Sequence, residues 1–292
     1  MPFSFRMLVL TAALSLAASA CATHKIDVGA NAQGTGGDVA ALLTEADALW
    51  DARVDKPSVE AAIAAYEKVY QADPGNLHAL TFLTRAVYFN ADAFTPDAEA
   101  KGQGFSTAIS WGDKALGTNA GFATAIQDGK NVSQAVSALT TEDEATALYW
   151  RSSALGKWAA AEGFGTIVKY KNEIFNSMTR VTEVAPISYY HGPDRYWGAY
   201  YARAPAFAGG DMTKSREHFD AAIAGDPLFL GHYVLLAEYW ATKSQDKPLF
   251  ESTLKKVLEA DPTAIEEIET EQRQEQLKAE KLMARIDELF ID

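Results

Sequence analysis

The fold is decided by the stretch at residues 211–227, which reads DMTKSREHFDAAIAGDP and ends in a proline. Ser215, Phe219 and Ala222 stand twelve, eight and five residues before that proline. Spacings of four and three place these side chains on one face of a helix, and the proline ends the helix because it disfavours a helical conformation in the residue before it. The stretch therefore predicts a helix with one packed face and a fixed end.

The same arrangement occurs three more times, each time before a proline. The corresponding residues are Ala62, Tyr66 and Val69 before Pro74; Ile174, Met178 and Val181 before Pro186; and Phe250, Leu254 and Val257 before Pro262. Pro227 and Pro262 stand thirty-five residues apart, close to the period of about 34 residues of tetratricopeptide repeats. Since each such repeat is a helix pair, the sequence predicts an all-α fold, a right-handed array of antiparallel helix pairs.

Further helices are predicted around these four. They span Val39–Asp51, Leu77–Phe89, Phe105–Leu116, Thr141–Glu162, Thr166–Val184, Arg195–Ala208 and Leu228–Thr242. Asp92–Gly104 is expected to be a loop because it contains proline and glycine, and residues 117–139 an irregular insertion with one short helix at Phe122–Ile126. The charged stretch Ile265–Phe290 is predicted to be a capping helix, so residues 39–292 form a single domain.

The start of the chain resembles the signal of a bacterial lipoprotein. One positive charge, Arg6, precedes the apolar run Met7–Ala20, which is too short to span a bilayer and is typical of a signal peptide at residues 1–20. The only cysteine, Cys21, follows at once, in the place of the acylated cysteine of lipoproteins. We expect a lipid anchor such as palmitate at Cys21 and a flexible, glycine-rich tether at residues 21–38. The alternative is a free thiol behind an ordinary signal peptide.

The composition is that of a globular protein with an acidic surface. Of 292 residues, 48% are hydrophobic, so the chain is long enough to bury a large core without disulfides. The formal net charge of −13 argues against nucleic acid and anionic lipid as partners. The sequence therefore predicts no nucleic-acid partner, and contact with a membrane only through the lipid anchor.

No motif in the sequence carries a known catalytic chemistry. Five histidines are present, but none has a partner at a spacing typical of metal ligands, and neither Gly-x-Ser-x-Gly nor a phosphate-binding loop occurs. Because Cys21 is assigned to the lipid anchor, no thiol is left for catalysis. The sequence predicts no catalytic residue, no metal site and no cofactor.

Aromatic residues between 149 and 240 are the positive signal for a binding site. The candidate lining residues are Trp150, Tyr189, Tyr190, Arg195, Tyr196, Trp197, Tyr200, Tyr201, Tyr233 and Tyr239. Aromatic side chains at helical spacing usually fill the space between helices, yet tyrosine favours places where one end of the ring is wet. Arg195 could receive a carboxylate, or pair with Asp194 or Asp211 instead. Core and cavity wall both remain open as interpretations of this block.

As a set, these features resemble the T component (TatT) family of lipoprotein-associated TRAP transporters. The resemblance rests on Cys21, on the turn at Gly192-Pro193 before an aromatic helix, and on the stretch 205–227, and it covers roughly residues 40–262. It implies a periplasmic lipoprotein that forms trimers and partners the substrate-binding subunit of the transporter. It also implies a hydrophobic passage for an apolar or amphipathic ligand. In lipoproteins, Ala22 in place of aspartate favours the outer membrane over the inner one.

Two main hypotheses of different classes result, beside a third, an enzyme with an unfamiliar site, which would require two titratable groups that converge in the cavity. The first is a non-enzymatic, lipid-anchored accessory protein of a TRAP-type uptake system, which binds the substrate-binding subunit and passes a hydrophobic carboxylate through an aromatic-lined cavity. The second is an envelope scaffold whose repeats bind peptides or assembly factors. A closed apolar cavity favours the first hypothesis, and an open groove lined by polar residues favours the second.

Overall fold

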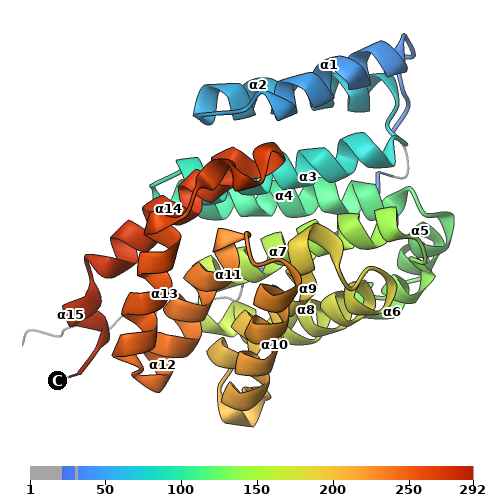
Figure 1. Ribbon diagram of the computed structural model, residues 1–292. Helices are drawn as coiled ribbons and strands as arrows, with labels where there is room; N and C mark the ends of the chain where they lie inside the picture. Colours follow the sequence, from blue (N-terminus) through green and yellow to red (C-terminus); the bar gives the residue numbers. More distant parts are fainter. Residues whose placement is uncertain (1–21, 30–31, 292) are drawn as a thin grey trace, which may run out of the picture.

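The computed structural model describes residues 22–29 and 32–291. The signal peptide predicted at residues 1–20 and the predicted lipidation site Cys21 lie outside the described residues. Over the described ranges the chain forms helices and no strand, which confirms the predicted all-α class (Figure 1).

Most helices pack against their sequence neighbours as pairs. The pairs are α1 (Val39–Asp51) with α2 (Lys56–Ala72), α3 (Leu77–Phe94) with α4 (Ala98–Gly117), α7 (Glu142–Glu162) with α8 (Phe164–Val184), and α9 (Ser188–Arg203) with α10 (Met212–Gly225). A fifth pair joins α13 (Lys247–Glu259) to a helix that runs from α11 (Leu230–Leu235) through the π-helical turn Leu236–Ala241 into α12 (Thr242–Ser244). The helical-repeat architecture predicted from the prolines is confirmed.

The repeat pattern fixes how the pairs pack. All twelve of its side chains, three each on α2, α8, α10 and α13, are buried. In α10, the Ser215 hydroxyl donates to the carbonyl of Gly198 at 2.7 Å, and a Cβ at Gly198 would stand 2.8 Å from the Phe219 ring. Small residues on both helices, Gly198 on α9 and Ser215 on α10, therefore let the two helices approach closely.

The prediction of a loop at Asp92–Gly104 is wrong. Helix α3 continues to Phe94, and α4 begins at Ala98 with the Asp97 carboxylate accepting from the amide of Ala100 at 2.8 Å. A Cβ at Gly104 would stand 2.7 Å from the Cβ of Ala91. Glycine is thus needed here for close helix packing and does not mark a break in the helix.

The insertion between α4 and α7 is more regular than predicted. It forms α5 (Ala120–Gln127), which contains the predicted short helix, then α6 (Val132–Ala135) and the 3-10 turn η1 (Val136–Ala138). Phe122 and Leu139 are fully buried and join the same hydrophobic cluster as Leu148 and Met178, and the insertion packs on α8.

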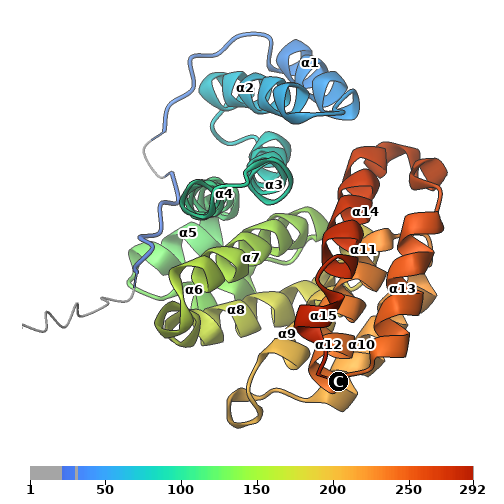
Figure 2. The ribbon, with the colours of Figure 1, turned by 90° about the vertical axis from the view of Figure 1, so that its left-hand side faces the viewer.

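The C-terminal stretch is broken where a single capping helix was predicted. It consists of the 3-10 turns η4 (Pro262–Ala264) and η5 (Glu266–Ile268), then α14 (Glu269–Met283) and α15 (Ile286–Leu289). Helix α14 packs on α13 and α11 and also reaches the first repeats, where Glu271 bonds Arg53 at 2.6 Å. Figure 2 shows α14 standing between the C-terminal helices and α3. It therefore connects the two ends of the array.

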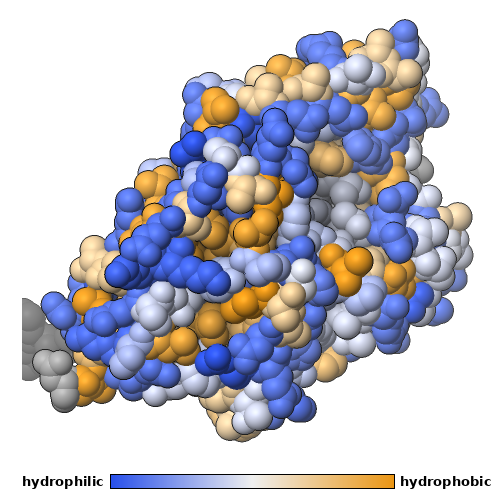
Figure 3. All heavy atoms as spheres, in the orientation of Figure 1, coloured by the Kyte–Doolittle hydropathy of each residue, from blue (hydrophilic) through white to orange (hydrophobic). Residues whose placement is uncertain are grey.

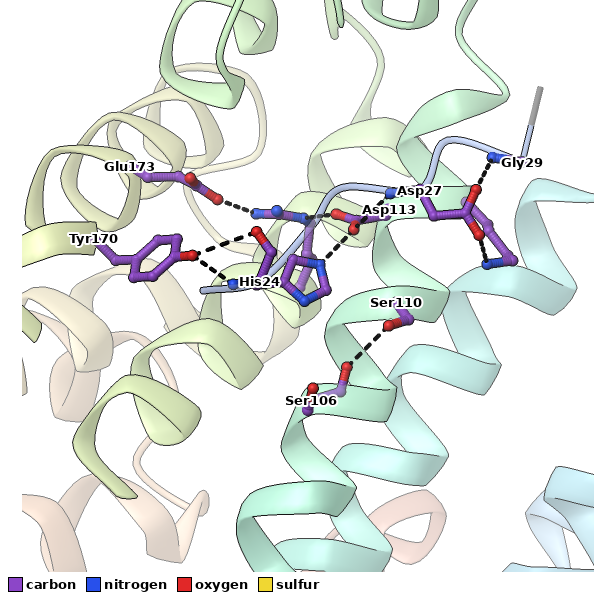
Figure 4. A network of polar contacts seen from close by, with 10 residues as sticks. His24, Asp27, Gly29, Ser106, Ser110, Asp113, Tyr170 and Glu173 are labelled. Carbon is purple, nitrogen blue, oxygen red and sulfur yellow. Dashed lines mark hydrogen bonds and ion pairs between the residues drawn. The ribbon is translucent and has the colours of Figure 1, made fainter. Parts of the chain in front are cut away.

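The segment predicted as a flexible tether begins with residues that bond to the helical body. The Tyr170 hydroxyl accepts from the amide of His24 at 2.7 Å, and His24 Nε2 lies 2.6 Å from the Asp113 carboxylate (Figure 4). Lys169 donates to the carbonyl of Ala22 at 3.1 Å. Residues 22–29 are thus held along α4 and α8 by hydrogen bonds to Asp113, Lys169 and Tyr170.

Candidate functional site

A cavity of about 490 Å³ lies between the helix pairs and is the candidate site. Residues of α3, α7, α8, α9, α11 and α14 line it. Its volume is within the range of roughly 300–1,000 Å³ of small-molecule sites. Figure 3 shows hydrophobic residues gathered in the middle of one face, between hydrophilic ones.

Aromatic rings dominate the cavity wall. The eleven aromatic residues that line it are Tyr88, Phe89, Tyr149, Trp150, Phe164, Tyr189, Tyr196, Tyr200, Phe207, Phe229 and Tyr239. Burial raises the pKa of Tyr189 to about 12 and raises that of Tyr196 as well. The phenols of Tyr189 and Tyr196 therefore stay neutral at physiological pH and offer hydroxyl groups within an apolar wall.

The structure brings six of the ten candidate residues to the cavity and places four elsewhere. The six are Trp150, Tyr189, Arg195, Tyr196, Tyr200 and Tyr239. The other four bond or stack outside it: Trp197 Nε1 donates to Thr182 at 2.9 Å, Tyr190 donates to Glu267, Tyr233 donates to the carbonyl of Pro227, and Tyr201 stacks on His218. On α9, one aromatic row thus faces the cavity and the adjacent row packs against α8 and α10.

A strained turn at the start of α9 shapes the wall. Tyr189, Tyr190 and His191 have φ angles of 48°, 54° and 49°, a left-handed conformation that costs an L-residue about 1–2 kcal/mol each. The turn sets the Tyr189 ring 4.6 Å from the Trp150 ring. At the next position, Gly192, a Cβ would stand 2.8 Å from the Tyr149 ring. Strain of this kind is typical of functional sites, where the surrounding structure enforces it.

Arg195 is the buried cation of the cavity. Its guanidinium donates to the Tyr149 hydroxyl at 2.8 Å and to the carbonyl of Tyr190 at 3.1 Å, and its carbon lies 4.3 Å from the centre of the Phe229 ring. Neither expected carboxylate pairs with it, since Asp194 bonds His218 and Asp211 caps α10. Among the described residues, no carboxylate lies within ion-pair distance of Arg195.

The other charges deep in the cavity are paired across elements far apart in the sequence. Asp92 of α3 bonds Lys157 of α7 at 3.0 Å and Lys278 of α14 at 2.7 Å. Burial alone would raise the pKa of Asp92, but the two ammonium groups outweigh it and hold the pKa well below its usual range. Glu271 likewise joins Arg85 to Arg53. Asp92 therefore stays ionised near neutral pH, and the two networks tie α14 to the first repeats.

The lining as a whole carries an excess of positive charge. It includes six cations, Arg85, Lys157, Lys171, Arg195, Arg203 and Lys278, and three carboxylates, Asp92, Glu271 and Glu275. This excess contrasts with the net charge of −13 of the whole chain. An apolar wall with uncompensated cations suits a ligand that has both an apolar part and a negative charge.

Behind Arg195, His232 makes the folded state sensitive to acid. The side chain is fully buried, and Nε2 has no hydrogen-bond partner in the described part of the chain. Burial, together with the charge of Arg195, lowers the pKa of His232 from 6.5 to about 2. The unfolded chain therefore binds one more proton below pH 6.5, and stability falls as the pH falls.

We expect His232→Phe to remove this part of the acid sensitivity. Wild type should lose about 2 kcal/mol between pH 7 and pH 5 through this one group, at 1.4 kcal/mol per pH unit below its unfolded pKa. The variant keeps an aromatic ring of similar size, so its loss over the same range should be smaller by that amount. Urea unfolding of both proteins at the two pH values measures the difference. An identical loss in both would contradict a neutral, buried His232.

Several lining residues could not be predicted from local sequence patterns. Glu271, Glu275 and Lys278 sit on a helix so rich in charges that none of them stands out. Arg85 and Asp92 are the only acidic residue, lysine or arginine in the stretch 77–94, which is mostly apolar, and that is the sequence signal that could have pointed to them.

Comparison with protein-family models identifies the family of this chain. The family model of the TRAP transporter T-component matches residues 51–290. A search of curated proteins gave no match. Among the described residues, no helix has the length and apolar character needed to cross a bilayer.

Proposed function

Because the chain belongs to the TRAP transporter T-component family, we propose that it is a lipid-anchored accessory component that binds the periplasmic substrate-binding subunit. In this proposal the cavity holds a hydrophobic ligand that carries a negative charge. The family match supports an accessory role in transport in place of a catalytic one.

The cavity is the observation that supports the ligand. Eleven aromatic residues enclose a space large enough for a small molecule, and Arg195 presents a buried positive charge that no carboxylate of the described residues neutralises. Leaving such a charge without a counterion is costly, so an anionic ligand would stabilise it. A purely apolar ligand would leave that cost in place.

The anchor and the assembly belong to the same proposal. Cys21 directly follows the apolar signal and would carry the acyl chains, and Ala22 favours the outer membrane. We further propose a homotrimer, as the family resemblance implies. The mass of the mature protein would reveal acylation of Cys21, and light scattering of the detergent-solubilised protein would reveal its oligomeric state.

Recovery of partners from membranes tests the transport role. Affinity purification of the tagged, full-length protein from its native membranes should recover a TRAP substrate-binding subunit. A matched purification of the Cys21→Ser variant, which cannot be acylated, should recover the same partner from the soluble fraction. Recovery of unrelated envelope proteins without that subunit would favour a scaffold and contradict the proposal.

A further inference from the structure

An exposed apolar patch surrounds the open side of the cavity. Phe164 and Val168 on α8 and Phe207 in the 3-10 turn η2 (Ala206–Ala208) are 64%, 46% and 86% exposed. All three also line the cavity. Exposed apolar groups gathered at one place mark an interaction surface, whereas the exposed Val54 lies alone between α1 and α2.

The chain passes this patch just after its lipid anchor. Ala22, the residue after Cys21, accepts a hydrogen bond at 3.1 Å from Lys169, five residues after Phe164 on the same helix. Five residues span about 7.5 Å of helix, and one residue step about 3.8 Å. Ala22 therefore lies beside the first half of α8, the half that carries Phe164 and Val168.

The anchor segment has little slack. His24 bonds both Tyr170 and Asp113, and Asp27 bonds Lys114 at 2.6 Å. A flexible tether would let the body stand away from the membrane, but a segment bonded in this way keeps α8 beside the lipid headgroups. The same turns of α8 carry exposed Lys169 and Lys171. Lysines beside exposed aromatic rings are typical of protein surfaces that lie in a membrane interface, where the rings enter and the ammonium groups stay among the headgroups.

We propose that the patch formed by Phe164, Val168 and Phe207 rests on the phospholipid surface, so that the cavity opens toward the bilayer and exchanges its ligand with the membrane. The proposal rests on the lipid anchor and the amphipathic ligand of the proposed function. The net charge of −13 does not argue against this contact, because the exposed lysines lie on α8 beside the patch and the acidic excess lies in other parts of the chain.

Hydrogen exchange on vesicles tests the contact. The mature chain from Cys21 onward, produced without acylation, is coupled through its only thiol to a maleimide phospholipid in phosphatidylcholine vesicles. Peptides covering residues 162–172 and 205–209 should exchange at least about tenfold more slowly than in the soluble, thiol-capped chain. The double variant Phe164→Asp/Phe207→Asp should lose this protection, and Val54→Asp should keep it. Unchanged exchange in both segments would overturn the proposal.

Ligand transfer provides a second measurement. The rate at which an anthroyloxy-labelled fatty acid moves from vesicles to the soluble chain should rise with vesicle concentration, because transfer requires collision with the membrane. The double variant should be at least about tenfold slower at the same vesicle concentration. A rate independent of vesicle concentration would overturn membrane exchange.

Failure of the proposed function would look different. If the fatty acid does not bind, the ligand part of that function fails, while protection on vesicles still decides the contact surface. If the double variant abolishes recovery of the substrate-binding subunit and leaves vesicle protection unchanged, the patch binds protein, and the membrane proposal is overturned.

Discussion

Replacing Asp113 with alanine is expected to lower the free energy of unfolding by about 3–5 kcal/mol, because it leaves a buried guanidinium without its closest counterion. Asp113 is fully buried and accepts from Arg151 Nε at 2.6 Å. Burial alone would lower the pKa of Arg151, but Asp113 and Glu173 outweigh it and raise the pKa above its usual value. A guanidinium stays protonated in proteins whatever its partner, so Arg151 remains charged in the variant, with only Glu173 at 2.8 Å to balance it.

The double variant Asp113→Ala/Arg151→Met is the matched control. Removing both charges together should recover most of the lost stability, since an apolar pair can replace a buried ion pair at little cost. Urea unfolding of the two single variants and the double variant measures the coupling. A loss below about 1 kcal/mol for Asp113→Ala would contradict a buried, interdependent pair.

The same substitution should also release the start of the chain. His24 Nε2 lies 2.6 Å from Asp113, and the amide of Asp27 donates to it at 3.2 Å. Limited proteolysis near residues 22–29 should become faster at denaturant concentrations where the helical body remains folded. This separates the loss of the anchor contacts from global unfolding.

The helical array could be predicted because its information is local and periodic. Each proline stops a helix, and the residues twelve, eight and five positions before it must share a face, as Phe219 and Phe250 show by their complete burial. Helix α14 could not be placed in this way. Its position depends on Glu271 meeting Arg53 and on Lys278 meeting Asp92, and no spacing encodes contacts across about two hundred residues.

From the sequence, the candidate site could be assigned to a helix but not to one face of it. Tyr196 and Trp197 are adjacent, so their side chains differ in direction by about 100° around α9, and the sequence alone does not say which direction holds the cavity. Tyr196 lines it, and Trp197 donates to Thr182 in the packed interior. The left-handed turn at Tyr189 could not be predicted from the sequence either, because tertiary contacts impose a positive φ angle that tyrosine disfavours.

Replacing Arg195 with glutamine is expected to weaken binding of decanoate roughly 30- to 150-fold, equivalent to about 2–3 kcal/mol for a lost charged hydrogen bond. Decanol, the neutral analogue of the same length, should bind wild type and variant with similar affinity. Isothermal titration with both ligands measures how far the substitution weakens decanoate binding relative to decanol binding. The comparison with decanol is needed because Arg195 also donates to the carbonyls of Tyr189 and Tyr190, so the substitution disturbs the turn itself.

Arg203→Gln separates the role of Arg195 from that of charge in general. Arg203 also lines the cavity but is exposed, with its guanidinium carbon 5.3 Å from the Tyr239 ring centre. Water screens an exposed charge, so this variant should change decanoate affinity only a few-fold. If the two variants weaken decanoate binding equally, the affinity depends on the overall electrostatic potential of the cavity. If Arg195→Gln weakens decanoate and decanol alike, Arg195 supports the shape of the wall and does not bind the anionic group. Selective loss of decanoate at Arg195 alone would identify this guanidinium as the partner of the ligand's charge.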